Sequence, residues 1–397
     1  MNKLYFSLSL IAALALATSC SNDDEPIQQL PEKTAGVQIL LNGGGATTRT
    51  VGIPGTLATS ETNINRVAIA IFTSSGQLNA LEEFDKTVLT QYSSGIKTPV
   101  IACSPGTNQT IYVVANAPKG LFKNAIAPTD FTGAILSDSL ITDLTPDNLP
   151  MSGTLRANGD NTSFVAGTSL TTPVTLTIGQ NQTVTKTIYL SRLVTRIALK
   201  KFTNSVVTPD TLDLTDVFLY NVPTSTRTDT AMVLKTYFTP SSFMGGQIDA
   251  ASTYRSTSTY LQQASWLSSA ITTLPNGTDA NAVWFYAFPN NNPYFPSDGV
   301  SNISYNTKLV LKGLYRTASG VSTVYYPISV NSTQGTITSS GDPYAGDGLT
   351  YRNHIYNVEA TIKGAGSSSP DIDPLQTALQ ARIYVDNWIE STQTIEY

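Results

Sequence analysis

The chain has 397 residues, of which 41% are hydrophobic and only 13% are charged, and its formal net charge is −5. Globular proteins usually carry about 25% charged residues, so uncharged polar residues take their place here. The sequence has no cluster of basic residues, which argues against a nucleic acid as a partner. The length is sufficient for two domains.

The first nineteen residues have the features of an export signal. A single charge at Lys3 precedes the apolar run Leu4 to Leu16, which is too short to span a bilayer. The small residues Ala17, Thr18 and Ser19 then lead to Cys20, whose thiol we expect to be lipid-modified. Bacterial lipoproteins usually have Leu at the place of Ala17, so a plain signal peptide with a chance cysteine is the alternative. The polar, acidic segment after Cys20 favours the lipoprotein.

The two cysteines do not predict an intramolecular disulfide. If Cys20 is acylated, Cys103 has no cysteine left to pair with. Cys103 ends the apolar, strand-like run 99–103. We therefore expect it to be a small buried hydrophobic residue and not a reactive thiol.

The N-terminal third predicts two strands, an exposed loop and one helix. Val37 to Leu41 forms a short strand, and residues 45–65 form a loop of small polar residues, the kind of segment that proteases cut. Val67 to Phe72 is a nearly continuous apolar strand. A helix is predicted over residues 79–92, because Leu81, Phe84, Val88 and Leu89 have helical spacing.

The rest of the chain is dominated by short strands separated by Asn, Gly, Pro and Ser. A domain boundary is predicted near residues 185–192. The clearest strands are 111–115, 174–178, 217–222, 283–288, 308–311, 324–328 and 358–362. Frequent turns and few helices indicate an all-β fold with two β-sandwich domains.

No group of residues in the sequence predicts catalysis. His354 is the single histidine, and it begins a strand, where a structural role is more common. The acidic pairs Glu82–Glu83 and Asp371 with Asp373 are expected to be solvated surface groups, although the second pair offers two oxygen ligands to calcium. We expect no enzyme activity, no metal and no cofactor.

Four short segments in a fixed order resemble the fimbrillins, which are the type V pilins of the Bacteroidota. These segments are 111–118, 149–153, 190–197 and 352–358, the last followed by 362–366. The resemblance implies an all-β protein with few short helices and two β-sandwich domains of the transthyretin-like type. It divides the chain into a signal peptide (1–19), a lipidated propeptide with the first strand (20–49), an N-terminal domain (50–188), a C-terminal domain (189–366), and a linker with a donor strand (367–397).

The resemblance also implies how the protein matures. A trypsin-like or arginine-specific protease would cut in the N-terminal loop and release the first strand, here with Val37, Ile39 and Leu41. The cut is expected between Arg49 and Thr50, because Arg49 is the only basic residue between Lys33 and Arg66. A cut at Arg66 would abut a core strand, which makes it the poorer site. An ordinary loop arginine is the alternative for Arg49.

The resemblance implies that release of the first strand opens a groove in the N-terminal domain and that a strand from a neighbouring subunit fills it. The donor strand should lie at the C-terminus. Residues 364–370 form a Gly/Ser linker, and the residues after it alternate between apolar and polar. The predicted donor residues are Leu379, Ala381, Ile383, Val385, Trp388 and Ile389. A last strand paired within its own domain buries the same face, so the sequence leaves both interpretations open.

Together these features predict a structural pilin of a surface fimbria that supports adhesion, with a precursor anchored to the outer membrane only through its lipid. The expected partners are identical or related pilin subunits, which would form a homopolymer, the maturation protease, and a host protein or glycan receptor. The alternatives are a fimbrial anchor that keeps its lipid, a tip adhesin that uses aromatic residues such as Tyr294 and Phe295, and a glycan-binding surface lipoprotein.

Overall fold

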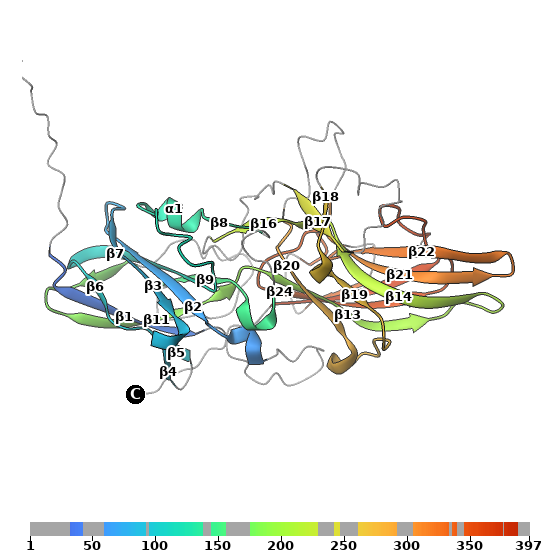
Figure 1. The fold of residues 1–397 in the computed structure, drawn as a ribbon, viewed down its shortest axis with the longest axis horizontal. Coiled ribbons are helices and arrows are strands. Elements are labelled where there is room, and N and C mark those ends of the chain that lie inside the picture. The colour runs from blue at the N-terminus through green and yellow to red at the C-terminus, as the bar shows by residue number, and fades with distance from the viewer. Residues whose placement is uncertain are drawn as a thin grey trace, which may run out of the picture. The chain divides into compact units, whose positions relative to one another are not determined.

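The computed structural model describes residues 32–42, 59–92, 95–137, 144–155, 175–228, 242–246, 261–291, 305–332, 336–339, 345–375 and 377–387. Residues Glu32–Tyr397 form one compact unit. In the described ranges the structure consists mostly of strands, and the only α-helix there is the five-residue α1 (Pro128–Thr132) (Figure 1). The predicted all-β class is confirmed. Among these residues, no helix has the length and apolar character needed to span a membrane.

The strands between residues 35 and 192 form two sheets that share a core, here called the first sandwich. One sheet contains β1 (Ala35–Asn42), β4 (Thr90–Tyr92), β5 (Gly95–Lys97), β6 (Ile101–Cys103) and β11 (Thr183–Tyr189). The other contains β2 (Arg66–Phe72), β3 (Leu78–Asp85), β7 (Gly106–Ala115), β9 (Met151–Thr154), β10 (Leu176–Ile178) and β12 (Ser191–Arg192). Both sheets contribute apolar side chains to the space between them.

Two larger sheets between residues 195 and 387 form the second sandwich. The first has the order β20-β13-β24-β25-β23, and the other has the order β19-β14-β21-β22. Their bounds are β13 (Thr195–Asn204), β14 (Thr211–Tyr220), β19 (Ser268–Ala270), β20 (Val283–Ala287), β21 (Lys308–Thr317), β22 (Gly320–Ser329), β23 (Thr336–Ser339), β24 (His354–Ile362) and β25 (Leu379–Asn387).

Two small sheets and several 3-10 turns complete the described structure. One small sheet has the order β15-β17-β18, and the other pairs β16 with β8. The strands are β8 (Ile135–Ser137), β15 (Val222–Pro223), β16 (Ser225–Arg227), β17 (Phe243–Gly245) and β18 (Leu261–Gln263). The 3-10 turns are η1 (Thr59–Thr62), η2 (Lys86–Val88), η3 (Pro146–Asn148), η6 (Ser265–Leu267) and η7 (Asp279–Asn281).

From Val67 to Phe72, strand β2 is apolar because both of its faces are buried. Val67, Ile69 and Ile71 face the core of the first sandwich, whereas Ala68 and Phe72 belong to the larger cluster that fills the second sandwich. A strand that is covered on both faces does not show the usual apolar–polar alternation.

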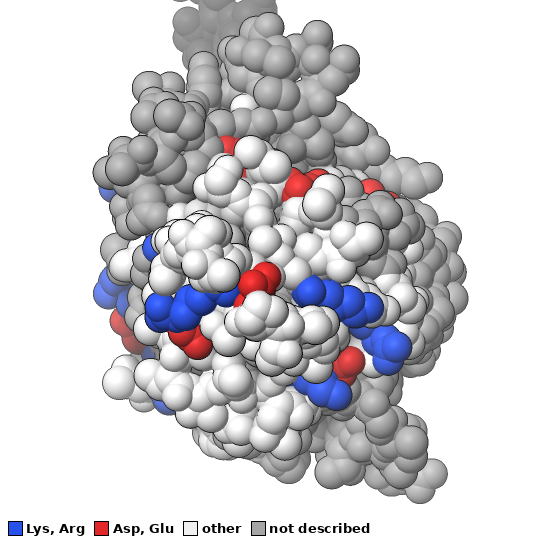
Figure 2. Space-filling view, turned by 90° about the vertical axis from the view of Figure 1, so that its right-hand side faces the viewer, with Lys and Arg blue, Asp and Glu red and all other residues white. Residues whose placement is uncertain are grey.

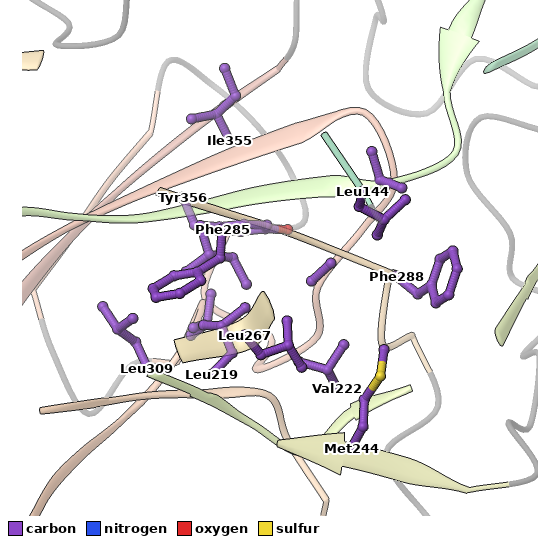
Figure 3. Packing of buried hydrophobic residues seen from close by; sticks show 14 of the residues in the cluster. Leu144, Leu219, Val222, Met244, Leu267, Phe285, Phe288, Leu309, Ile355 and Tyr356 are labelled. Carbon is purple, nitrogen blue, oxygen red and sulfur yellow. The ribbon is translucent and has the colours of Figure 1, made fainter. Parts of the chain in front are cut away.

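The large cluster is continuous across the part of the chain where one sandwich gives way to the other. Figure 3 shows Leu144, from the N-terminal part of the chain, in the same cluster as Val222, Met244 and Phe288 from the C-terminal part. The two sandwiches therefore share apolar packing in addition to their separate cores.

The predicted helix over residues 79–92 is wrong. The structure places β3 at Leu78–Asp85, followed by η2 and the short β4. Leu81 packs against the large cluster and Phe84 against the core of the first sandwich, so these two side chains point to opposite faces of the sheet. Apolar contacts on both faces can produce a spacing of three residues without a helix.

The strands change from the first sandwich to the second between Arg192 and Thr195. Strand β12 still pairs with β9, and β13 pairs with β20 and β24. The domain boundary at residue 188 stays a prediction, since Glu32–Tyr397 form one compact unit.

Candidate functional site: the slot of strand β1

Strand β1 is the central strand of its sheet. It pairs in parallel with β11 over seven residues, from Gly36–Thr183 to Asn42–Tyr189. On its other side it pairs antiparallel with β6 near its start and with β5 near its end. Strand β11 has no other strand partner in the described structure, so the loss of β1 would leave its edge unpaired.

Thr98 closes the gap between β5 and β6. Its backbone N–H donates to the Ile39 carbonyl oxygen at 3.0 Å, and its Oγ1 accepts from the Ile39 N–H at 3.1 Å. Its carbonyl oxygen accepts from Gln38 Nε2 at 3.1 Å. Strand β1 is thus hydrogen-bonded along both edges. Its removal would leave a gap in the sheet, here called the slot, with unpaired backbone donors and acceptors of β11 on one side and of residues 95–103 on the other.

The inward side chains of β1 are fully buried. Val37, Ile39 and Leu41 have 0% exposure, and all three belong to the core of the first sandwich. Burial of three such side chains contributes roughly 5–9 kcal/mol, at about 1.5–3 kcal/mol each. Removal of β1 would therefore leave both unpaired backbone groups and an apolar cavity. A replacement strand must form hydrogen bonds with the first and fill the second with apolar side chains.

A side chain at Gly36, the outward position at the start of the slot, would meet the side chain of Val100. A Cβ atom at Gly36 would lie 2.6 Å from Val100 Cγ1 and 3.1 Å from Thr183 Oγ1. Val100 is half exposed and can rotate away, so a replacement strand with a side chain here must displace it.

Several predicted site residues lie outside the described residues. They are the lipidation residue Cys20, the cleavage residues Arg49 and Thr50, and the donor residues Trp388 and Ile389. Tyr294 and Phe295, considered for a tip adhesin, also lie outside. The described chain does show that β1 precedes, and β2 follows, the segment that contains Arg49.

The described donor residues form β25 within their own sandwich. Leu379, Ala381, Ile383 and Val385 lie on this strand, which pairs with β24 over nine residues and with β23 over four. Ile383 and Val385 are buried in the large cluster. This is the in-domain pairing that the sequence left open as an alternative.

The segment predicted as a flexible linker is docked onto β22. Ser367 and Tyr325 exchange two backbone hydrogen bonds of 2.9 Å. A Cβ atom at Gly366 would lie 2.5 Å from the Tyr325 carbonyl oxygen, so the close approach requires glycine. Asp371 accepts from the Tyr220 hydroxyl at 3.0 Å, and Asp373 pairs with Lys308 at 2.9 Å.

The other residues that the sequence analysis considered for chemistry, namely the cysteine, the histidine and the first acidic pair, have surroundings that suit a structural role. Cys103 is fully buried, as expected, and burial raises the pKa of its thiol. His354 begins β24 and is buried, with its Nδ1 2.7 Å from the Arg352 carbonyl oxygen. Glu83 accepts from the Gly120 N–H, while Glu82 is exposed. Among the described residues, no group of His, Cys, Asp and Glu is arranged to hold a metal ion.

No local sequence pattern predicts the buried ionic cluster that joins the two sandwiches. Glu61 on η1 is 1% exposed and pairs with Arg196 of β13 at 2.7 Å. The same carboxylate accepts from the Tyr286 hydroxyl of β20, and Arg192 donates to the Glu61 carbonyl oxygen. The Arg196 guanidinium lies 4.4 Å from the ring centre of Trp284. Residues 61, 196 and 286 are too far apart in sequence for any local pattern to connect them.

The face shown in Figure 2 carries few charges, and both signs are interspersed among uncharged side chains. Among the described residues on this face, no field of one sign marks it for a strongly charged partner.

The fold and the slot define a class of protein. It has two β-sandwiches in tandem, and an N-terminal strand completes the first of them from the centre of a sheet. Residues 35–192 match the model of the family described as major fimbrial subunit protein (FimA). The chain is also 24% identical, over an alignment of 428 residues, to the major fimbrium subunit FimA type-5 of Porphyromonas gingivalis, with 98% of each chain covered.

Solved structures show the same fold. A fimbrilin (FimA) from Porphyromonas gingivalis W83 superposes with a TM-score of 0.63 at 16% identity, covering 91% of this chain and 99% of that one. A protein from Parabacteroides distasonis whose suggested role is cell adhesion gives a TM-score of 0.61 at 20% identity, covering 89% and 99%. These matches confirm the resemblance to the fimbrillins: the chain is similar in sequence and in fold to fimbrial subunits of the Bacteroidota.

Proposed function

We propose that this protein is a structural subunit of a surface fimbria, with no enzymatic role, that matures by losing β1. The precursor would be exported as a lipoprotein through Cys20 and cut between Arg49 and Thr50 by a trypsin-like or arginine-specific protease. The central place of β1 in its sheet carries the proposal. Its loss would open a slot that only another strand can fill, because both backbone edges and the apolar floor must be satisfied together.

The C-terminal segment of a neighbouring subunit is the proposed replacement. Two versions of this donation differ in what must break. If β25 itself is donated, its nine-residue pairing with β24 must be lost first. If the donor is the sequence after Asn387, β25 stays in its own sheet and only residues 388–397 enter the slot. The second version breaks no described hydrogen bond, and we favour it on that ground.

Two other roles in the same class of assembly are tested against this one. A fimbrial anchor would keep its lipid and escape cleavage, and a tip subunit would bind a host protein or glycan. A glycan-binding surface lipoprotein would instead present an aromatic platform or a carboxylate cleft. N-terminal sequencing of the protein extracted from the cell surface separates a subunit that begins at Thr50 from an anchor that keeps acylated Cys20.

Limited trypsin digestion tests the maturation step in vitro. We expect the first 49 residues to be removed and the soluble monomer to convert into heat-resistant oligomers. Arg49→Ala should block both events. Lys33→Ala is the matched control, because Lys33 is exposed and precedes β1, so a cut there leaves the strand attached. An Arg49→Ala protein that forms oligomers as readily as the parent would exclude the assigned site.

Two truncations test the donor. Loss of residues 388–397 should leave a folded monomer that accepts a strand but cannot extend a filament. Loss of residues 379–397 removes β25 as well and should also destabilise the second sandwich, since Ile383 and Val385 are buried there. If the shorter truncation still forms full-length filaments, the donor includes β25.

A further inference from the structure

The short segment between the predicted cleavage site and β2 is fastened at both of its ends. This segment, residues 61–65, is here called the anchor segment. It follows the part of the chain that contains Arg49 and precedes Arg66, the first residue of β2. After a cut at Arg49, these five residues lie between the new chain end at Thr50 and β2. Any unfolding that starts at the new end must therefore stop at them or pass through them.

The first end of the anchor segment is bound by the second sandwich. Glu61 Oε1 accepts from Arg196 Nη1 at 2.7 Å and from the Tyr286 hydroxyl, and both groups come from strands of the second sandwich. From β12 of the first sandwich, the Arg192 side chain also donates from Nε and Nη2 to the Glu61 carbonyl oxygen, at 3.3 and 3.1 Å. Arg196 and Glu61 are only 2% and 1% exposed, so solvent does not screen their attraction.

The second end is bound by the first sandwich. The Asn116 side chain donates to the Asn63 carbonyl oxygen and accepts from the Asn65 N–H, both at 2.8 Å. Ile64 is 2% exposed and lies in the same core as the inward side chains of β1. Loss of β1 thus removes apolar side chains from the core to which Ile64 belongs, but it removes none of the described partners of Glu61.

We propose that Glu61 is a buried clamp that stops the opening of the chain at the anchor segment once β1 is lost. A new chain end at Thr50 would fray, as free ends do. Fraying that passed the anchor segment would leave Arg66 without a fastened segment before it, held by its strand pairing in β2 and by its ion pair with Asp85 at 2.8 Å, which makes cleavage there easier. Arg66 is the next basic residue after Arg49, and cleavage there would leave Val67, a core residue, as the chain end. The clamp keeps this second cut from following the first. Its role in maturation rests on the proposed function; its protection of Arg66 does not.

Trypsin digestion of the full chain, followed by mass spectrometry, tests the clamp. In the parent protein, we expect the product that begins at Thr50 to accumulate and the product that begins at Val67 to form slowly. Glu61→Gln keeps the shape but removes the charge, and it should accelerate cleavage after Arg66 by roughly tenfold, as expected for a lost charged hydrogen bond. Tyr286→Phe removes one hydroxyl donor and should give a smaller increase.

Two controls separate a clamp from a general loss of stability. Cleavage after Lys123, an exposed residue of the first sandwich, serves as the internal reference and should not change. Asp213→Asn removes a carboxylate from an exposed ion pair with Arg316 and should leave cleavage after Arg66 at the parent rate.

Three results would overturn the clamp. They are an unchanged rate after Arg66 in both Glu61→Gln and Tyr286→Phe, an equal increase at Lys123, and an equal increase in Asp213→Asn. If Glu61→Gln fails to fold, Tyr286→Phe decides alone. If trypsin does not cut at Arg49, the proposed maturation site fails, but the rate after Arg66 in the uncut chain still reports the clamp.

Discussion

Ala35 on β1 lies directly opposite Cys103 on β6, and both side chains are buried in the core of the first sandwich. Cys103 is the only cysteine of the described residues, and it is fully buried there. Strand β1 supplies the one strand partner that β6 has in the described sheet. The thiol is therefore shielded by the strand whose removal is proposed to trigger assembly.

The rate at which a thiol reagent modifies Cys103 should depend on whether a strand occupies the slot. A thiol reagent should not modify it in the precursor, should modify it within minutes after trypsin removes the first 49 residues, and should be excluded again in the oligomer. Cys20 is lost with the removed piece, so the mature chain has one cysteine and the signal is unambiguous. Mass spectrometry of labelled protein measures it. Equal labelling of precursor and cut monomer would mean that β1 stays in its slot.

Substitutions in β1 should affect only the precursor. Ile39→Ala removes buried methyl groups from a fully enclosed site and should lower the free energy of unfolding of the full chain by about 2–4 kcal/mol. The filament should be as resistant to heat as the parent filament, because the strand is absent from it. Ile69→Ala on β2, which is equally buried and stays in the mature chain, is the control and should weaken both forms. Urea unfolding and heat dissociation measure the two quantities.

Lys200 should make stability rise with pH above neutrality. Its burial, and the nearby charge of Arg196, lower the pKa of its ammonium group to about 8. Between this value and the ordinary value of 10.5, the unfolded chain keeps the proton while the folded protein has lost it. The free energy of unfolding therefore increases with pH in this interval, and the cost of the buried charge is fully present below pH 8.

Comparison with Lys200→Met isolates this effect. From pH 7 to pH 10 the parent should gain roughly 1–3 kcal/mol relative to the variant, as measured by urea unfolding at each pH. Burial raises the pKa of Cys103 and of Tyr286, which lowers stability as pH rises, but both groups are present in the two proteins and cancel in the difference. Lys201→Met, on the exposed neighbour, is the control. A constant difference across this range would contradict the prediction.

Asn116 should tolerate glycine better than alanine. Its backbone has a φ of 57°, in the left-handed region, and its side chain donates to the carbonyl oxygens of Asn63 and Leu149 and accepts from the Asn65 N–H. Asn116→Ala loses these bonds and adds backbone strain, for a total cost of about 3–4 kcal/mol. Asn116→Gly loses the same bonds without the strain and should be about 1 kcal/mol more stable than the alanine variant. Thermal unfolding of both proteins measures the difference, and the opposite order would show that the conformation at this position changes.

Two asparagines in the motifs of the family resemblance form hydrogen bonds with backbone groups that are distant in sequence. Asn116 belongs to the first motif and fixes the anchor segment, and Asn353 belongs to the last and accepts from the Arg192 N–H at 3.2 Å. A sequence pattern can register that an asparagine stands at a strand end. It does not state which distant backbone groups the side chain satisfies.

Local properties of the sequence were enough to determine the all-β class, the strands at β1 and β2, and the burial of Cys103. Alternation, apolar runs and turn residues act over a few neighbours, and these are the features that define a strand. The same rules failed at β3, because Leu81 and Phe84 reach cores on opposite faces of a doubly covered sheet and so mimic a helical spacing.

Only the tertiary structure decided which strands enclose β1, that β25 pairs within its own sandwich, and that Glu61 binds across to Arg196 and Tyr286. Sheet pairing and buried ion pairs join residues that are up to 225 positions apart, as Glu61 and Tyr286 are. Their energies depend on where the folded chain excludes water and brings opposite edges together. A window of neighbouring residues does not show which distant residues pair or where water is excluded. For this protein, those pairings distinguish a strand that stays in its sheet from one that is proposed to be removed.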